Sequence, residues 1–189
     1  MKRVKAVDSA LRYLESNKPK AIIVTDEGIT EPTTRPVVEK LYTYIQNGGR
    51  VIIGLHFPTF VAVGKLNYFF THHFGLSWRR GSYTRDDFQL NPACSLPNYV
   101  AARSFPPPYS MKALHLIGAK PEEKIFVPIP GDPSQPARYT AEYLDSTEAR
   151  VLAARIERGY IVYIGDMNPE EGSDKVIVAF CGLSMTGDD

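Results

Sequence analysis

The chain has little of what marks secreted, membrane-spanning or nucleic-acid-binding proteins. Only two of its 189 residues are cysteines, Cys94 and Cys181. Two cysteines cannot form a disulfide framework, so we expect a reducing compartment and a cytoplasmic location. No apolar run approaches the roughly 20 residues that span a membrane. Charged residues interrupt the stretch after the basic N-terminus, so we expect neither a membrane partner nor a signal peptide.

The charge balance and composition are those of an ordinary globular protein. The formal net charge is +1, which gives no reason to expect a nucleic-acid partner. Hydrophobic residues make up 43% of the chain and charged residues 23%, so disorder is not expected. The length suits one domain with its own core, and we expect residues 1–189 to form it. Small-molecule binding and self-association are both compatible with this composition, which identifies no cofactor.

The N-terminal third has the pattern of a strand–helix–strand unit. Apolar residues at helical spacing predict helices over 4–14 and 34–45. Short β-branched runs predict buried strands at 21–25 and 51–55. Such a crossover is almost always right-handed and makes its two strands parallel neighbours. A further helix, rich in aromatic residues, is expected over 61–74.

The rest of the chain predicts a hairpin, a last helix and an irregular insertion. Strands at 151–156 and 160–164 flank a tight turn that we expect Gly159 to form, at the edge of the sheet. A helix follows over 174–180. Residues 76–136 are rich in proline and should lay short strands and loops over one end of the sheet. The predicted fold is α/β, flavodoxin-like and doubly wound, with three layers, a mostly parallel sheet and a C-terminal β-hairpin.

Two segments carry a family resemblance. Residues 44–56 place a glycine pair before a strand that ends in Gly54-Leu55-His56, and residues 153–166 form a glycine-containing hairpin that ends in Gly165-Asp166. Both segments resemble the class I glutamine amidotransferase-like superfamily, nearest its ThuA-like branch. The late hairpin of that branch commonly ends in Gly-His, which differs here. The superfamily contains glutaminases, peptidases and members without a known reaction.

The glutaminase nucleophile of that superfamily is missing. It is a cysteine on a strained strand-to-helix turn, normally within Gly-x-Cys-x-Gly, where the helix N-terminus lowers the thiol pKa. Cys94 has no glycine on either side, and Cys181 lies at the end of a predicted helix, where the dipole raises the pKa. We therefore expect no glutaminase activity. Cys94 is either a structural residue or a reactive thiol.

Acids and an imidazole follow three of the predicted strands. Asp26 and Glu27 follow the first, His56 the second and Asp166 the last. The carboxyl ends of parallel strands meet at one edge, which is where ligands bind in open α/β sheets. Such a set could bind a divalent cation or perform acid–base chemistry. Alternatively, these acids only cap the turns that follow the strands.

Three functions are compatible with these features. The first is a non-enzymatic binding or scaffold protein of the amidotransferase-like superfamily. The second is a hydrolase that uses the strand-end cluster, with or without a metal. The third is a regulatory protein that binds a small ligand under the 76–136 region. The apolar wall of a strand-end site would come from Phe57, Tyr83 or Trp78.

Overall fold

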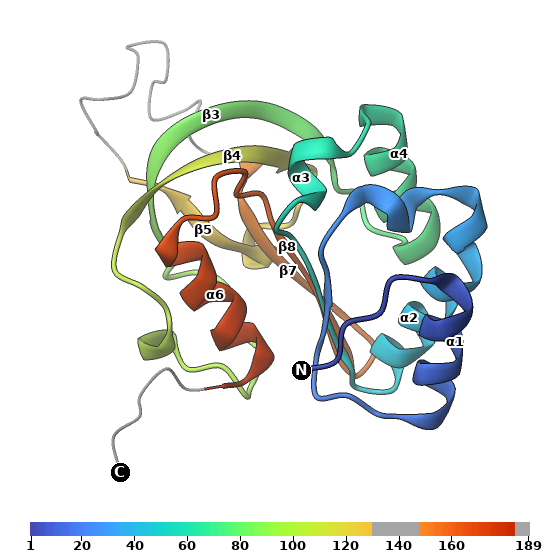
Figure 1. Ribbon diagram of the computed structural model, residues 1–189. Coiled ribbons are helices and arrows are strands. Elements are labelled where there is room, and N and C mark those ends of the chain that lie inside the picture. Colours follow the sequence, from blue (N-terminus) through green and yellow to red (C-terminus); the bar gives the residue numbers. More distant parts are fainter. Residues whose placement is uncertain (130–147, 184–189) are drawn as a thin grey trace.

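The computed structural model of the chain describes residues 1–129 and 148–183, and within them one eight-stranded sheet has the order β1-β2-β8-β7-β5-β3-β4-β6 (Figure 1). The strands are β1 (Ile22–Val24), β2 (Arg50–Ile53), β3 (Arg79–Leu90), β4 (Tyr109–Ile117), β5 (Lys124–Pro128), β6 (Glu148–Ala149), β7 (Val151–Ile156) and β8 (Gly159–Ile164). The α-helices are α1 (Val7–Ser16), α2 (Arg35–Gln46), α3 (Phe57–Phe60), α4 (Val63–Tyr68) and α6 (Glu171–Cys181). Short 3-10 turns are η1 (Glu27–Thr30), η2 (Pro32–Thr34), η4 (Ala102–Ser104) and η5 (Pro121–Glu123), and η3 (Phe69–His73) is a π-helix.

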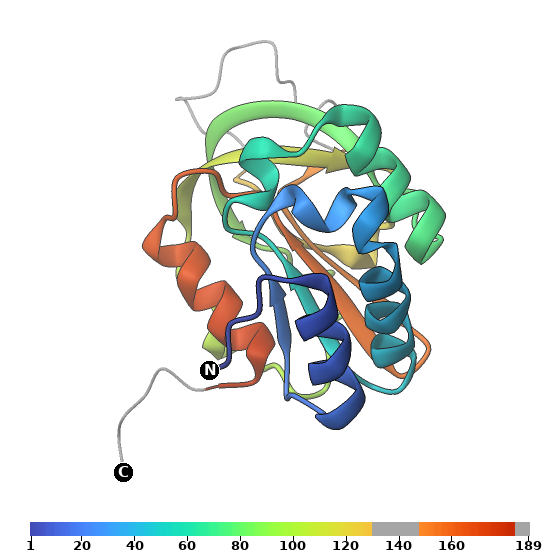
Figure 2. The same cartoon turned by 45° about the vertical axis from the view of Figure 1, so that its right-hand side comes forward.

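The first part of the sheet is parallel, as the sequence predicts. β1 pairs with β2 in register Ile23↔Ile52, and β2 pairs in parallel with β8. Alternate side chains enter two cores: Val51 and Ile53 pack with the α2 side, and Ile52 packs with the α6 side. Figure 2 shows α1 and α2 in front of these strands, with α6 on the other side. The β-branched run is therefore buried on both faces.

The prediction of a mostly parallel, flavodoxin-like sheet is wrong. Of the seven strand pairings in the described residues, only two are parallel and five are antiparallel. The region 76–136 contributes β3, β4 and β5 to the sheet itself and does not merely cover it. Its last residues, 130–136, lie outside the described residues.

The predicted hairpin exists, but it lies inside the sheet and not at its edge. β7 and β8 pair antiparallel, while β8 also pairs with β2 and β7 with β5. The left-handed residue of the turn is Glu157, with φ of 53°. Gly159 has a different role, because a Cβ there would lie 2.1 Å from the carbonyl oxygen of Ile45 and 2.3 Å from that of Gly49. Close approach of α2 requires this glycine.

The antiparallel strands curl until the sheet meets itself. β6 and β7 are one chain segment interrupted at Arg150; β4 pairs with β6, and β5 pairs with β7. β3, which is 12 residues long, forms the arch in Figure 1, with a register shift between Arg80 and Tyr83. Such irregularities increase strand bending and twist. The result is a closed end of the sheet formed by β3, β4, β5 and the β6–β7 segment.

The helices largely follow the sequence pattern. The predicted helices at 4–14 and 34–45 correspond to α1 and α2, while the one at 61–74 is divided into α4 and η3, and the short α3 before it was not predicted. The last helix, α6, ends at Gly182, whose φ is 67°. Within residues 1–129 and 148–183, no helix is both long enough and apolar enough to cross a membrane.

Candidate functional site

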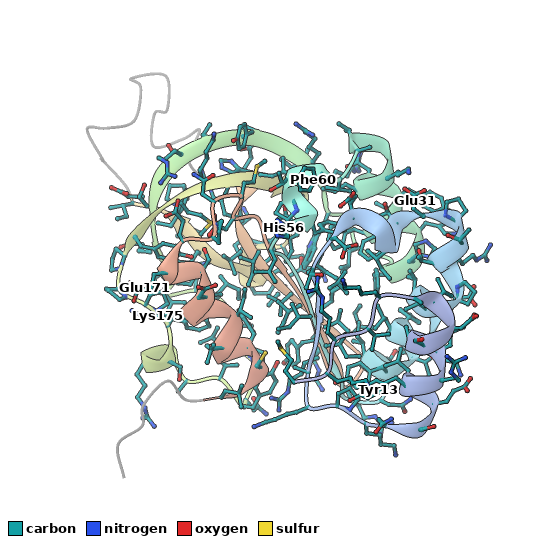
Figure 3. The ribbon with its side chains drawn as sticks, in the orientation of Figure 1. Tyr13, Glu31, His56, Phe60, Glu171 and Lys175 are labelled. Atoms are coloured by element: carbon teal, nitrogen blue, oxygen red, sulfur yellow. The ribbon has the colours of Figure 1, made fainter. Side chains whose placement is uncertain are left out.

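The structure places Asp26 and His56 at the same edge of the sheet. They follow the neighbouring strands β1 and β2, and the His56 amide donates to the Thr25 carbonyl at 2.9 Å. Leu55, just before His56, has a φ of 59°. For a residue that is not glycine, this left-handed conformation costs about 1–2 kcal/mol. His56 is exposed, and its ring centroid lies 6.3 Å from that of Phe60 (Figure 3).

We call the edge that carries Asp26, Glu27 and His56 the strand-end rim. Its acidic residues belong to a local turn. The two carboxylate oxygens of Asp26 accept from the Gly28 amide and the Thr25 hydroxyl, each at 3.1 Å, which caps η1. Glu27 is half-buried in the first turn of η1. Among the described residues, no hydrogen bond or ion pair joins His56 to either acid.

Asp166 is buried and fully engaged in a loop. Its oxygens accept from the amides of Asn168 at 2.9 Å and Glu170 at 2.8 Å, which fixes the approach to α6.

Phe57 and Trp78, two of the predicted wall residues, are wholly buried in the core. In the described part of the chain, no three His, Cys, Asp or Glu side chains are arranged to hold a metal ion.

A buried polar network, which the sequence analysis missed, lies where the sheet closes. Arg150 donates from Nη2 to Asp86 Oδ2 at 2.7 Å and from Nε to His115 Nε2 at 2.8 Å. His115 Nδ1 lies 2.8 Å from Glu148 Oε2. Arg150 and His115 are only 5% and 1% exposed. Polar contacts from β3 complete the network through Ser82 and Thr84.

The hydrogen bonds of this network fix the histidine tautomer. An arginine can only donate, so His115 Nε2 accepts and Nδ1 carries the proton that is donated to Glu148. Ser82 donates its own proton to Glu148 Oε2 at 2.5 Å. The imidazole nitrogen that faces the Ser82 hydroxyl is Nδ1, at 2.8 Å, and because it carries the proton it cannot be the base that a serine nucleophile needs. The network therefore joins β3, β4 and the β6–β7 segment and does not form a catalytic triad.

Two pKa shifts follow from this geometry. Burial lowers the pKa of His115 from 6.5, although the hydrogen bond to Glu148 opposes the effect. Burial alone would raise the pKa of Glu148 from 4.5, but hydrogen bonds from His115 and Ser82 outweigh it and lower the pKa to about 2. The folded protein thus favours a neutral imidazole beside an ionised carboxylate.

Both shifts make the protein less stable in acid. Because the unfolded chain takes up the His115 proton more readily, stability is lost as the pH falls below 6.5. Glu148 stabilises the fold above pH 4.5, and this stability is lost as the pH falls towards 2.

We expect Glu148→Gln to flatten the lower part of this profile in urea unfolding measured from pH 7 to 2. Glu122→Gln is the control, because Glu122 is exposed, and this variant should keep the wild-type pH profile. An unchanged acid slope in Glu148→Gln would contradict the assignment.

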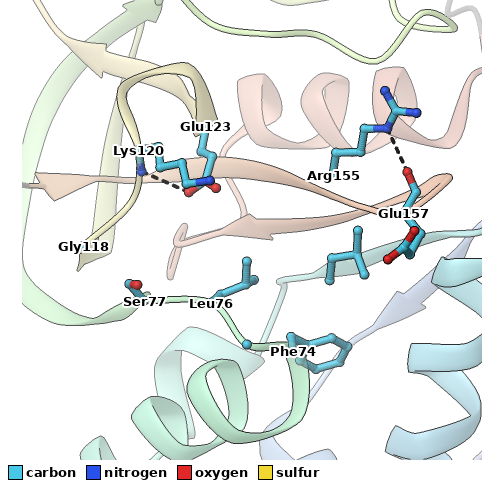
Figure 4. Close-up of a pocket in the computed structure, with 10 residues that line it drawn as sticks. Phe74, Leu76, Ser77, Gly118, Lys120, Glu123, Arg155 and Glu157 are labelled. Atoms are coloured by element: carbon cyan, nitrogen blue, oxygen red, sulfur yellow. Dashed lines mark hydrogen bonds between the residues drawn. The ribbon is translucent and has the colours of Figure 1, made fainter.

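A groove of about 330 Å³ lies at the opposite end of the β7–β8 hairpin from the rim (Figure 4). It is bounded by the β7–β8 turn, residues 74–77 and residues 118–123, and we call it the hairpin-end groove. Phe74, Leu76 and Ile156 make its apolar part. It was not predicted, because it forms between segments that are distant in the sequence.

Charged residues line two sides of the hairpin-end groove. On the hairpin side, Arg155 Nε donates to the Glu157 carbonyl at 2.8 Å, and its guanidinium points away from residues 74–77 (Figure 4). On the other side are Lys120 and Glu123, as Figure 4 shows. Glu123 Oε2 accepts from Trp78 Nε1 at 2.9 Å and from the Lys120 amide at 3.0 Å. The Glu123 carboxylate is therefore held in place before any ligand arrives.

Three left-handed residues line this same groove. They are Gly75, Gly118 and Glu157, with φ of 67°, 82° and 53°. At Gly118 a Cβ would lie 2.2 Å from the Ser77 carbonyl oxygen, so glycine is needed for the close approach of the two loops. Glu157 adopts this conformation without being glycine. Such strain is concentrated at functional sites.

The cysteines are not activated thiols. Burial raises the pKa of both Cys94 and Cys181, so each thiol stays protonated near neutral pH. Both are free cysteines in the structure. Of the two alternatives for Cys94, this environment favours the structural one.

Comparison with known proteins adds no assignment. No protein-family model matches the chain, and no curated protein matches it.

Proposed function

We propose that this protein is a non-enzymatic small-molecule-binding domain whose ligand occupies the hairpin-end groove. The observation that carries the proposal is the convergence of three left-handed residues and one oriented carboxylate, that of Glu123, on a groove of about 330 Å³. Small-molecule sites combine an apolar surface with a few placed polar groups, in volumes of about 300–1,000 Å³.

The state of the other polar groups supports this choice. Asp166 is used by the loop before α6, and Arg150 already donates to Asp86 and His115. In the described residues, by contrast, the Glu157 carboxylate and the Lys120 ammonium make no hydrogen bond or ion pair with the protein. These groups are therefore available to a ligand.

The proposal extends to the class and location of the protein. The segments 44–56 and 153–166 support membership of the amidotransferase-like superfamily, as a member without the glutaminase nucleophile. Two free cysteines support a cytoplasmic location. The net charge of +1 supports a small-molecule partner over a nucleic acid.

A thermal-shift screen against small metabolites tests the proposal. We expect at least one compound to raise the Tm of the wild-type protein, because a ligand that binds only the folded state stabilises it. The exposed lining residue Ser77 offers a blocking variant, Ser77→Trp, which should abolish the shift. Ser16→Trp, at the exposed end of α1, should retain it. A shift that persists in Ser77→Trp, or conversion of the bound compound followed by NMR, would contradict a non-enzymatic groove site.

A hydrolase centred on the strand-end rim is a second candidate. The observation that favours it is the left-handed Leu55, which presents the exposed His56 beside Asp26. The test is hydrolysis of a panel of esters and amides by the wild-type protein and two variants. Activity that is lost in His56→Ala but kept in Ser77→Trp would support the hydrolase over the groove-binding protein.

A further inference from the structure

We propose that two copies of this chain associate through the open edge of β1, which pairs antiparallel with β1 of the second copy. β1 stands at one end of the sheet order, and among the described residues it pairs only with β2. Such an edge presents backbone amides and carbonyls that a further strand can use. This surface is separate from the hairpin-end groove, so the inference goes beyond the proposed function and does not rest on it.

The pairing of β1 with β2 identifies the residue that faces outward. The Val24 carbonyl accepts from the Gly54 amide at 3.1 Å, so Val24 faces β2. Because the backbone groups of successive strand residues point to opposite sides, Ile23 faces away from β2. No residue in the described part of the chain forms a hydrogen bond with the Ile23 amide or carbonyl. If Ile23 of one copy lies opposite Ile23 of the other, the two residues exchange both of their N–H···O bonds.

The charges beside β1 favour a second, antiparallel copy as the partner. Lys18 and Lys20 precede the strand, and Asp26 and Glu27 follow it. A two-fold axis at Ile23 brings the basic end of each strand against the acidic end of the other, with Lys20 opposite Asp26. A copy in the parallel direction would instead place lysine beside lysine and acid beside acid, which destabilises a pair of strands.

The two opposed charges are able to meet. Both side chains are exposed. Lys20 Nζ donates to the Gly182 carbonyl at 2.7 Å, and its other ammonium protons remain for a second acceptor. Asp26 accepts one hydrogen bond on each oxygen, from Gly28 and Thr25, while a carboxylate offers about four acceptor positions. An intermolecular ion pair therefore breaks no bond that either residue makes within its own chain.

The segment before α1 lies over this edge but is not bonded there. Residues 1–6 cross in front of β1, the blue strand of Figures 1 and 2. All of them except Val4 are exposed. Among the described residues, no hydrogen bond or ion pair holds residues 1–5 in place. A second copy that pushes this segment aside therefore breaks no polar contact.

Sedimentation velocity on the full chain tests the association. We expect a reversible monomer–dimer equilibrium that Lys20→Glu weakens at least about tenfold, because attraction becomes repulsion at both ends of the pair. The double variant Lys20→Glu/Asp26→Lys exchanges the charges and should restore the dimer. Arg79→Glu, a charge reversal at an exposed position of β3, should leave the equilibrium unchanged. A monomer at every concentration, or equal effects of Lys20→Glu and Arg79→Glu, would overturn the inference.

A cysteine cross-link tests the position of the two-fold axis. Opposed residues of a hydrogen-bonded antiparallel pair have Cα atoms about 5.5 Å apart, a distance that a disulfide can bridge. Ile23→Cys should therefore form a covalent dimer under mild oxidation. Ile22→Cys should not, because the axis places residue 22 opposite Val24. The wild-type protein, with its own free cysteines, is the oxidation control. Cross-linking of Ile22→Cys but not of Ile23→Cys would contradict this axis, and thermal unfolding shows whether each variant is folded.

Discussion

Replacing Arg150 by alanine is expected to lower the free energy of unfolding by about 3 to 5 kcal/mol, the cost of leaving a buried charge without its partner. The guanidinium lies 2.7 Å from Asp86, and the two side chains are only 6% and 10% exposed. Without Arg150, the Asp86 carboxylate would stay in a place that water hardly reaches. Urea unfolding at neutral pH, extrapolated to zero denaturant, measures the change.

The chain offers a matched control for this result. Arg85 also lies 2.7 Å from a carboxylate, that of Glu170, but these side chains are 45% and 26% exposed. Exposed ion pairs contribute less than about 1 kcal/mol, so Arg85→Ala should have a small effect. Equal losses in Arg85→Ala and Arg150→Ala would show that the network does not hold the closed end of the sheet.

Gly159→Ala is expected to destabilise the protein by about 3 kcal/mol, at the upper end of the usual cost of overpacking. The new methyl group would lie 2.1 Å from the Ile45 carbonyl oxygen and 2.3 Å from that of Gly49. Both obstacles are backbone atoms, so no rotation of a side chain relieves the contact. Either α2 must move away from β8 or the register of the hairpin must change.

Gly64→Ala is the matched control. Gly64 lies in α4, and no atom lies within 4 Å of the Cβ position there. Because alanine favours helix over glycine by about 1 kcal/mol, this change should leave the protein as stable or make it more stable. If Gly159→Ala were as harmless as Gly64→Ala, the close approach of α2 to β8 would be refuted.

The sequence predicted the parts of the fold whose signals are local. The β-branched runs gave β1 and β2, and the glycine-containing turn gave the β7–β8 hairpin. The curled region was not predicted, because its strands pair with partners far along the chain. The alternation of side chains along β3 is also misleading. Its polar face, with Ser82, Thr84 and Asp86, points into the buried network, while the aromatic Tyr83 is 42% exposed. Polar residues on one face of a strand normally indicate the solvent side.

The candidate sites differ in how far the sequence could indicate them. Asp26 and His56 reach one edge because their strands are parallel neighbours, and that rule applies to any sheet of this kind. Asp166 could not be assigned, because the loop amides that it accepts from are known only from the structure. Glu157 carries no sign in the sequence that it adopts a left-handed conformation.

Chemical-shift mapping is the most direct test of the central claim that the ligand occupies the hairpin-end groove. The measurement is an amide NMR titration of the wild-type protein with a compound that raises its Tm. We expect the largest shifts in the groove amides, those of Ser77, Gly118, Lys120 and Glu157. Largest shifts at Asp26, Glu27 and His56 instead would place the ligand at the strand-end rim and contradict the account.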